Sequence, residues 1–234
     1  EDIGLLPDGG EPRSSGSGID PEEISQEPDS IEGNFNVQQA LRTKSFWLIL
    51  TGVITRVSAT NAIMVHIFPM LQLKGMNEST ASTSVAAMYL LAIPLRFLLG
   101  IAAGKFSSRK ILFWGMFVGA VGILALWGMP GMAGVAMFIV GLSIVEGITS
   151  VNWLMVGEYF GRLRYATLMG IMIFFNSLGM FIAPLFAGFV RDRTDNYDLV
   201  LLTFAPVLVL SAISFGLASK PVLPKLFIDN HANT

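Results

Sequence analysis

The sequence has no cysteine, and only 14% of its 234 residues are charged. The absence of cysteine excludes disulfides, zinc sites with thiolate ligands and cysteine nucleophiles. The chain also lacks paired ligands at metal-binding spacing, a glycine-rich loop for phosphate and a Ser/His/Asp set. We therefore expect no catalytic residue, no metal and no cofactor, and we expect that the protein is not an enzyme.

Long apolar runs take up most of the chain. Hydrophobic residues make up 53% of it and the mean hydropathy is +0.62, which is more apolar surface than a soluble domain of this size can bury. Six runs are long enough to cross a membrane as helices. They are expected at residues 46–71, 85–103, 111–129, 135–156, 167–190 and 199–218. The expected fold is an all-α membrane protein with a bundle of six transmembrane helices over residues 35–220.

The first 34 residues differ in composition from the rest. They hold ten of the seventeen acidic residues against one basic residue, Arg13, and they are rich in Gly, Ser and Pro. Too few large apolar side chains are present to offset the entropy of ordering this segment. We expect a disordered, acidic cytoplasmic linker, with a docking motif as the less favoured alternative, and no binding of nucleic acid. Because the chain begins with Glu1, we expect it to start inside a longer gene product.

Lysine and arginine are unequally shared between the two ends of the expected helices. Nine lie at one end and three at the other, so the positive-inside rule places the richer end in the cytoplasm. The richer end holds Arg42, Lys44, Lys105, Arg109, Lys110, Arg162, Arg164, Lys220 and Lys225, and the other holds Lys74, Arg191 and Arg193. Both termini are then cytoplasmic, with residues 221–234 as a tail. We expect a multi-pass protein of the plasma membrane or cell inner membrane.

Four polar residues on different helices share one depth. Arg56, Arg96, Glu146 and Asn176 each lie about 13 to 17 Å from an edge of a hydrocarbon core about 30 Å thick. Charge at this depth is tolerated where it faces water, a partner or a ligand. Arg96, within a strongly apolar helix, is expected to be buried. The shared depth is the strongest indication of function in the sequence.

Glu146 lies on a polar stripe along its helix. The other residues of this stripe lie three, four or seven positions from Glu146, and they are Ser143, Thr149, Ser150 and Trp153. We expect this stripe to face a cavity. One alternative is that Glu146 pairs with an arginine and locks two helices together. Two arginines and one glutamate leave a surplus cation after any such pairing, which favours binding of an anionic substrate.

Asn61 and His66 extend the polarity of the first helix toward its outer end. Asn61 joins Arg96, Arg56 and Asn176 as a candidate substrate-binding residue. His66 joins Glu146 as a candidate for proton or ion coupling, although an interfacial hydrogen bond is the favoured role for it.

Glycine and proline recur inside the apolar runs. Small-residue spacing predicts close approach of helices at Gly100 and Gly104, at Gly115 and Gly119, and at Gly170, Gly179 and Gly188. Four prolines are expected to kink or weaken their helices, namely Pro69, Pro94, Pro184 and Pro206.

Four segments resemble the monocarboxylate-transporter and oxalate–formate-antiporter type of the major facilitator superfamily. ALRTKSFWLIL (40–50) is similar to the lead into the seventh helix of that family, and GEYFGRLRYATLMG (157–170) to its link between helices ten and eleven. RFLLGIAAGKFSSRK (96–110) resembles the basic loop motif between helices eight and nine, and GMFIAPLFAGFVRD (179–192) extends the match. The resemblance covers nearly everything from residue 40 to about residue 220.

The resemblance implies twelve helices in two halves with the substrate between them. This chain would supply the C-terminal six-helix half, and its partner would be the N-terminal half of the same transporter. Arg96 matches the arginine that such proteins use for a substrate carboxylate. Asn176 stands where oxalate–formate antiporters carry a lysine, which favours a monoanion. Ala92 stands where monocarboxylate transporters have an aspartate, which leaves Glu146 as the candidate for coupling.

The loop motif matches at Gly100, Lys105, Arg109 and Lys110. It departs from the family at Gly104, where an aspartate is usual, and at Ser107 and Ser108.

The expected function is secondary active transport of a small organic anion, such as a monocarboxylate, across the lipid bilayer by alternating access, as a symporter or an antiporter. Two alternatives remain. One is a facilitator of another solute in which Arg96 is structural. The other is a receptor or interaction protein that keeps a transporter-like fold without transporting.

Overall fold

The computed structural model describes residues 35–222, and these form eight helices. The helices are α1 (Val37–Leu41), α2 (Lys44–Leu73), α3 (Glu78–Lys105), α4 (Ser108–Gly128), α5 (Gly131–Gly147), α6 (Thr149–Phe160), α7 (Tyr165–Thr194) and α8 (Asp198–Leu217). The expected linker over residues 1–34 and most of the expected tail over 221–234 lie outside the described residues. With α5 and α6 taken together, the described helices include six that are long and apolar enough to cross a membrane. The expected all-helical fold with six spans is confirmed.

The helices begin and end where caps and turns allow, which extends them beyond the apolar runs. The Asn77 side chain accepts a hydrogen bond from the Thr80 N–H at 2.8 Å, so α3 begins at Glu78 and not at residue 85. The short α1 has a capping box in which Asn36 and Gln39 bond each other's backbone. Apolar content marks the part of a helix within the membrane, whereas the cap sets its first residue.

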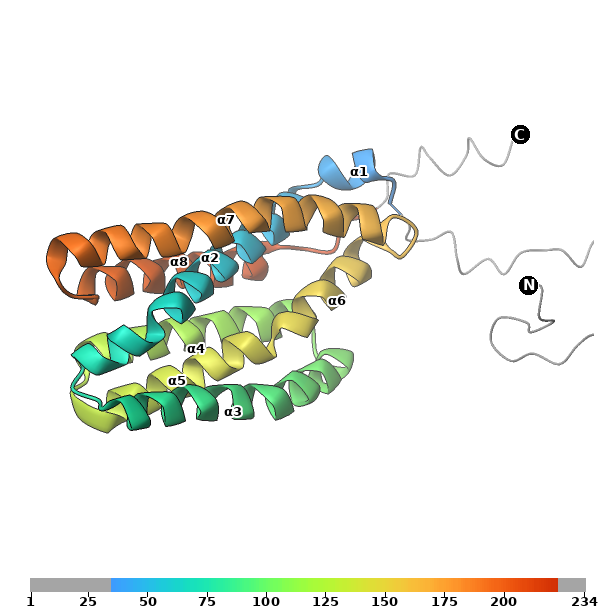
Figure 1. Cartoon of the computed structure of the whole chain (residues 1–234). Coiled ribbons are helices and arrows are strands. Elements are labelled where there is room, and N and C mark those ends of the chain that lie inside the picture. Colours follow the sequence, from blue (N-terminus) through green and yellow to red (C-terminus); the bar gives the residue numbers. More distant parts are fainter. Residues whose placement is uncertain (1–34, 223–234) are drawn as a thin grey trace, which may run out of the picture. The chain divides into compact units, whose positions relative to one another are not determined.

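The six spans pack in a fixed order. The main contacts join α7 to α2, α2 to α8, α8 to α4, α4 to α5, and α5 to α3. Figure 1 shows α7 and α8 on one side and α3, α4 and α5 on the other, with α2 and α6 running obliquely between them. The helices α3 and α7 stand at the two ends of this order, so they bury the smallest shares of their apolar length, 11% and 17%, against 50% or more for each of the others.

Glycine permits the closest crossings. A methyl group at Gly122 of α4 would lie 2.9 Å from the Met137 carbonyl oxygen and 3.2 Å from Cα of Gly141 on α5. The expected close approaches are present at Gly119, against Val145 and Leu208, and at Gly179, against Ser58. Gly100, Gly104 and Gly170 have no described atom within 4 Å of an added methyl group. The expectation is wrong for these three within the described chain, because they lie on the sparsely covered helices α3 and α7.

One span is interrupted, and proline is not the cause. The run expected as a single helix over residues 135–156 is divided at Ile148 into α5 and α6. The four prolines lie inside α2, α3, α7 and α8, and none of them ends its helix. The position of the break therefore corrects the expectation of one continuous helix.

Candidate functional site

The interruption between α5 and α6 is the place where the polar residues meet. The Ile148 N–H donates to the Ile144 carbonyl at 3.0 Å, while the Val151 N–H turns back to the carbonyl of Ile148 at 2.9 Å. The Ile148 carbonyl thus accepts this tighter i to i−3 bond together with the α-helical bond from the Asn152 N–H at 3.3 Å, so α6 begins with one tightened turn. Irregular backbone at membrane depth is found where it is buried in protein or lines a cavity. The break follows Glu146 by two residues.

Gly147 brings α3 against this break. A methyl group there would lie 2.9 Å from the Leu95 Cβ and 3.4 Å from the backbone nitrogen of Arg96. The backbone of α3 therefore approaches the end of α5 at the residue that carries the arginine. A glycine at this point is what allows Arg96 to reach the interrupted helix.

Arg96 binds the backbone at this junction. Its Nη2 donates to the carbonyl oxygen of Glu146 at 3.3 Å, which is one of the carbonyls at the end of α5. The side chain is exposed, so the expectation of a buried Arg96 is wrong for the described chain. The physical reason is that α3 covers α5 with one side only, with Met88 and Ala92 buried along it.

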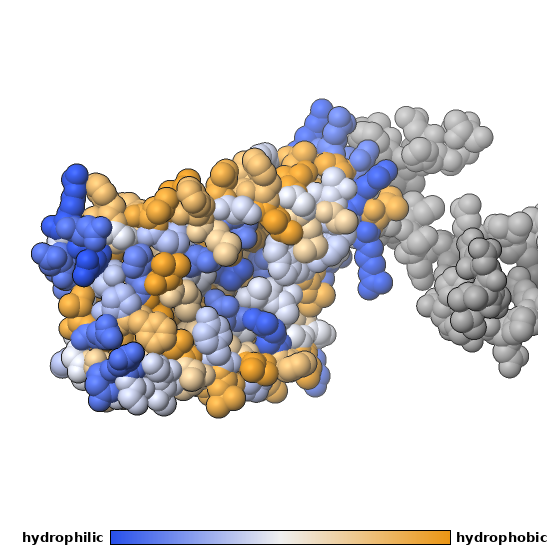
Figure 2. Space-filling view, viewed as in Figure 1, coloured by the Kyte–Doolittle hydropathy of each residue, from blue (hydrophilic) through white to orange (hydrophobic). Residues whose placement is uncertain are grey.

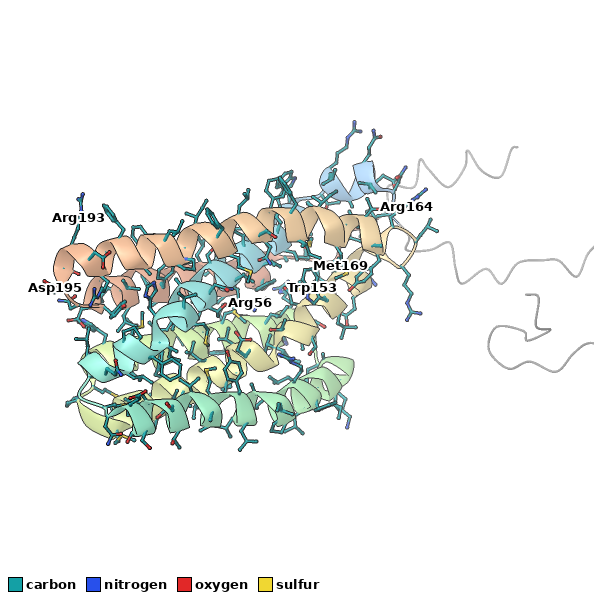
Figure 3. The ribbon with its side chains drawn as sticks, in the orientation of Figure 1. Arg56, Trp153, Arg164, Met169, Arg193 and Asp195 are labelled. Atoms are coloured by element: carbon teal, nitrogen blue, oxygen red, sulfur yellow. The ribbon has the colours of Figure 1, made fainter. Side chains whose placement is uncertain are left out.

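Arg56 reaches the same junction from α2 and is buried, with 4% of its surface exposed. Its Nη1 donates to the Thr149 hydroxyl at 3.5 Å, and its Nε has no hydrogen-bond partner. Thr60 does not contact the guanidinium, because its hydroxyl donates to the backbone carbonyl of Arg56. Figure 3 places Arg56 midway along the helices, between Arg164 near one end and Arg193 and Asp195 near the other.

Glu146 is half-buried. In the described part of the chain its carboxylate lies within 4 Å of neither guanidinium, although the charges of Arg56 and Glu146 attract each other at longer range. A direct ion pair with Glu146 is therefore not what joins these helices. The junction holds two positive groups and one negative group, which leaves the surplus cation that the sequence predicts.

The polar stripe around Glu146 is only partly formed. Ser143 is fully buried and donates to the carbonyls of Ile139 and Met88, so it belongs to the contact between α5 and α3 and not to a cavity. The break after Gly147 changes the rotation of the residues that follow it. Thr149 faces Arg56, while Ser150 is exposed. The expected single stripe is thus wrong for Ser143 and correct in bringing Thr149 to the charged groups.

Asn152 is a candidate that sequence reasoning missed. It lies on α6 with 0% of its surface exposed, and neither its Oδ1 nor its Nδ2 has a hydrogen-bond partner. A buried, unsatisfied amide costs about 1 to 3 kcal/mol, and such groups in native proteins call for an explanation such as a ligand or water. The sequence feature that could have identified Asn152 is its carboxamide, which lies within an apolar run six residues after Glu146.

Asn61 and Asn176 are not drawn into this cluster. The Asn61 Nδ2 donates to the Val57 carbonyl of its own helix at 3.1 Å. Asn176, half-buried on α7, has an Oδ1 without a partner. Neither asparagine makes a hydrogen bond to Arg56, Arg96 or Glu146 within the described residues.

His66 belongs to a separate network near the far ends of α2 and α7. Its Nε2 lies 3.1 Å from the Pro184 carbonyl and its Nδ1 lies 3.1 Å from the Tyr197 hydroxyl. The carbonyl can only accept, so Nε2 carries the proton and Nδ1 accepts from the tyrosine. Burial raises the pKa of Tyr197, which keeps its hydroxyl proton in place. These bonds connect α2, α7 and the start of α8.

The residues of the basic loop lie at the ends of α3 and α4. Lys105 is the last residue of α3, while Arg109 and Lys110 lie in the first turn of α4. Arg109 donates to the carbonyl of Ala218 at 3.5 Å. Gly100, one turn before the end of α3, has no described neighbour within 4 Å of an added methyl group. No set of three His, Asp or Glu side chains within residues 35–222 is placed to hold a metal ion.

Six apolar spans, one of them interrupted two residues after Glu146, define a multi-pass membrane protein. The model of the Major Facilitator Superfamily matches residues 12–184 and, in a second match, residues 48–228. The chain belongs to the Major Facilitator Superfamily, a family of membrane transporters. A comparison with curated proteins gave no match.

Proposed function

We propose that this protein is a secondary active transporter of a small organic anion, of the monocarboxylate type, that works by alternating access. The observation that carries the proposal is the meeting of Arg56 and Arg96 beside Glu146 at the break between α5 and α6. Interrupted helices near the membrane midplane form the substrate and ion sites of several transporter folds. Arg56 and Arg96 bind the substrate carboxylate, and Glu146 carries the coupling proton.

The balance of charge at the junction supports an anionic substrate. Arg56 is buried with its Nε unpartnered, and a buried charge without a partner is strongly unfavourable. A carboxylate can accept two parallel hydrogen bonds from a guanidinium, and such charge-assisted bonds are about twice as strong as neutral ones. Asn152 of α6 supplies two further buried polar atoms without partners. The proposed substrate therefore has one carboxylate and a neutral polar group.

The uncovered faces support a second six-helix half. The helices α3 and α7 are the least covered of the six spans, and three of their glycines, at positions 100, 104 and 170, have no described neighbour. Glycine on an open helix face lets another helix approach closely. Figure 2 shows hydrophobic residues along the α7 and α3 edges of one face and more hydrophilic residues across its middle. In our proposal this middle faces the substrate path between the two halves.

The proposed orientation places the ends near Arg42, Lys105 and Arg164 in the cytoplasm of a plasma or cell inner membrane. Within the superfamily, we assign the chain to the monocarboxylate-transporter and oxalate–formate-antiporter type on its sequence resemblance. Buried Ala92 offers no carboxylate for coupling, which leaves this role to Glu146. Asn176 in place of a lysine favours a monoanion over oxalate.

Uptake of labelled carboxylates tests the proposal directly. The complete protein is reconstituted in liposomes and offered a panel of labelled monocarboxylates, oxalate and a neutral sugar of similar size. We expect saturable uptake of at least one monocarboxylate, with competition from other monoanions and none from the sugar. Uptake of the neutral solute alone contradicts the proposal.

One observation favours a second candidate function. The hydrogen bond from Arg96 to the Glu146 carbonyl holds α3 against α5, which is a structural role. In that case the protein is a facilitator of another solute, and Arg96 does not bind it. Substitution of Arg96 then lowers the melting temperature without changing which solute is transported, whereas the first proposal predicts loss of anion uptake in a folded protein.

A further inference from the structure

The first turn of α4 concentrates positive charge. The N-terminus of a helix carries a partial positive charge that acidic side chains normally offset. The first turn of α4 has no acidic residue, its N-cap Ser107 makes no side-chain cap, and Arg109 and Lys110 add two cations. In the described part of the chain neither cation has a carboxylate within 4 Å. Arg109 donates to the carbonyl of Ala218 at the C-cap of α8, which offsets part of this charge, and an anion beside this end of α4 would offset the rest.

A groove begins next to these cations, between α4 and α8. Its volume is about 310 Å³, and it is lined by Arg109, Lys110, Phe113 and Trp114 of α4 and by Ile213 and Leu217 of α8. Gly216 of α8 also lines it, and a methyl group there would lie 2.8 Å from Cδ2 of Phe113. The groove is thus basic at the end of the helices and apolar farther along them.

A second groove lies on the opposite flank of the same turn, between α4, α3 and α5. Its volume is about 430 Å³, and Leu99, Phe106, Val118 and Ile144 are among its almost wholly apolar walls. Lys110 and Trp114 line both grooves. The indole of Trp114 is 60% exposed and the ring of Phe106 is 67% exposed, so these walls are open to whatever surrounds the helices.

We propose that this surface binds an anionic phospholipid. The phosphate lies against Arg109 and Lys110, and one acyl chain occupies each groove with Trp114 between them. Trp114 follows Arg109 by five residues, which is about 7.5 Å along the helix, the depth at which tryptophan prefers the boundary between head-groups and acyl chains. Basic pockets between transmembrane helices on the cytoplasmic side bind anionic head-groups.

A diacyl lipid fits this surface better than its competitors. Free phosphate satisfies the two cations but leaves both apolar grooves exposed. The anion of the proposed transport site is small and has no chains to fill them. A phospholipid alone joins an anionic head-group to two chains, which matches one basic turn flanked by two apolar grooves.

Native mass spectrometry of the purified protein in detergent measures this binding. Phosphatidylglycerol and phosphatidylcholine with identical acyl chains are titrated separately, and inorganic phosphate is added as a competitor. We expect phosphatidylglycerol to bind about thirtyfold more tightly, since each basic residue near the surface favours the anionic lipid. The double variant Arg109→Gln, Lys110→Gln removes this preference. The matched variant Arg42→Gln, Lys44→Gln retains it, because neither residue lines a groove.

Trp114→Ala separates the contribution of the acyl chains from that of the head-group. We expect this variant to bind both lipids more weakly by the same factor, so that the preference for phosphatidylglycerol remains. Equal binding of the two lipids to the unaltered protein overturns the proposal. So does displacement of phosphatidylglycerol by phosphate, which would indicate an anion site alone. If the double variant Arg109→Gln, Lys110→Gln changes the oligomeric state but still binds phosphatidylglycerol, this surface is a contact between copies of the protein. That outcome also overturns the proposal. Since lipid retention is the readout, the result does not depend on the proposed transport activity.

Discussion

The guanidinium of Arg96 donates to the backbone carbonyl of Glu146 at 3.3 Å, beside the break between α5 and α6. The arginine therefore holds the backbone of the residue whose carboxylate we propose for coupling. Binding of a substrate carboxylate to Arg96 would compete with this hydrogen bond. Substrate binding and the geometry of Glu146 are in this way connected through one side chain.

Arg96→Gln is expected to abolish most anion uptake without loss of the folded protein from the membrane. Loss of a hydrogen bond to a charged group costs about 1.5 to 3 kcal/mol, which corresponds to about a 10- to 150-fold weaker apparent affinity for the substrate. The measurement is initial uptake of the labelled monocarboxylate against concentration, normalised to membrane expression. Arg42→Gln, which removes an exposed arginine at the end of α1, is the control and should transport normally. Unchanged affinity in Arg96→Gln would refute substrate binding by this residue.

Glu146→Gln is expected to separate exchange from accumulation. A glutamine keeps the shape of the side chain but cannot carry a proton between the two sides of the membrane. We expect exchange of labelled for unlabelled substrate to continue, while accumulation driven by a proton gradient is lost. Glu158→Gln is the control, because Glu158 lies near the end of α6 away from the break. If gradient-driven accumulation persists in Glu146→Gln, the coupling group lies elsewhere.

Asn152→Leu is expected to stabilise the protein while it impairs transport. The substitution removes two buried polar atoms that have no partner, which should raise the free energy of unfolding by about 1 to 3 kcal/mol. Ser143→Ala is the contrasting variant, because it removes two hydrogen bonds made by a buried hydroxyl. It should lower stability by about 1 kcal/mol. Thermal unfolding in detergent and uptake in liposomes measure the two effects, and a destabilised Asn152→Leu would show that the amide has a structural role.

Gly122→Ala is expected to loosen the crossing of α4 and α5. The added methyl group would lie 2.9 Å from the Met137 carbonyl oxygen, and a backbone atom cannot turn aside as a side chain can. Overpacking of this kind costs about 1 to 3 kcal/mol, measured as a lower melting temperature. Gly128→Ala on the same helix is the control, because nothing lies within 4 Å of its added methyl group. Equal melting temperatures for the two variants would contradict the observed crossing.

Hydropathy predicts the six spans because crossing a hydrocarbon core requires about 20 apolar residues. It does not predict the break at Ile148, because the apolar run continues across this residue. Beside this break the backbone of Leu95 and Arg96 in α3 packs against Gly147, a contact between residues about fifty positions apart that hydropathy does not contain. The expected stripe failed at Ser143 because the packing of α5 against α3 buries this residue, and a helical wheel contains no information about the neighbouring helix.

The sequence by itself determined the fold class and the number of spans, because both follow from local apolar length and from the fixed rise of a helix. The shared depth of Arg56, Arg96 and Glu146 stays a prediction. Only the tertiary structure decided which polar groups meet. Arg56 and Arg96 reach the break from α2 and α3, Asn152 is left buried without a partner, and His66 bonds to Tyr197 at a distance from them. Depth restricts a residue to a plane, whereas helix rotation and packing decide its position within that plane.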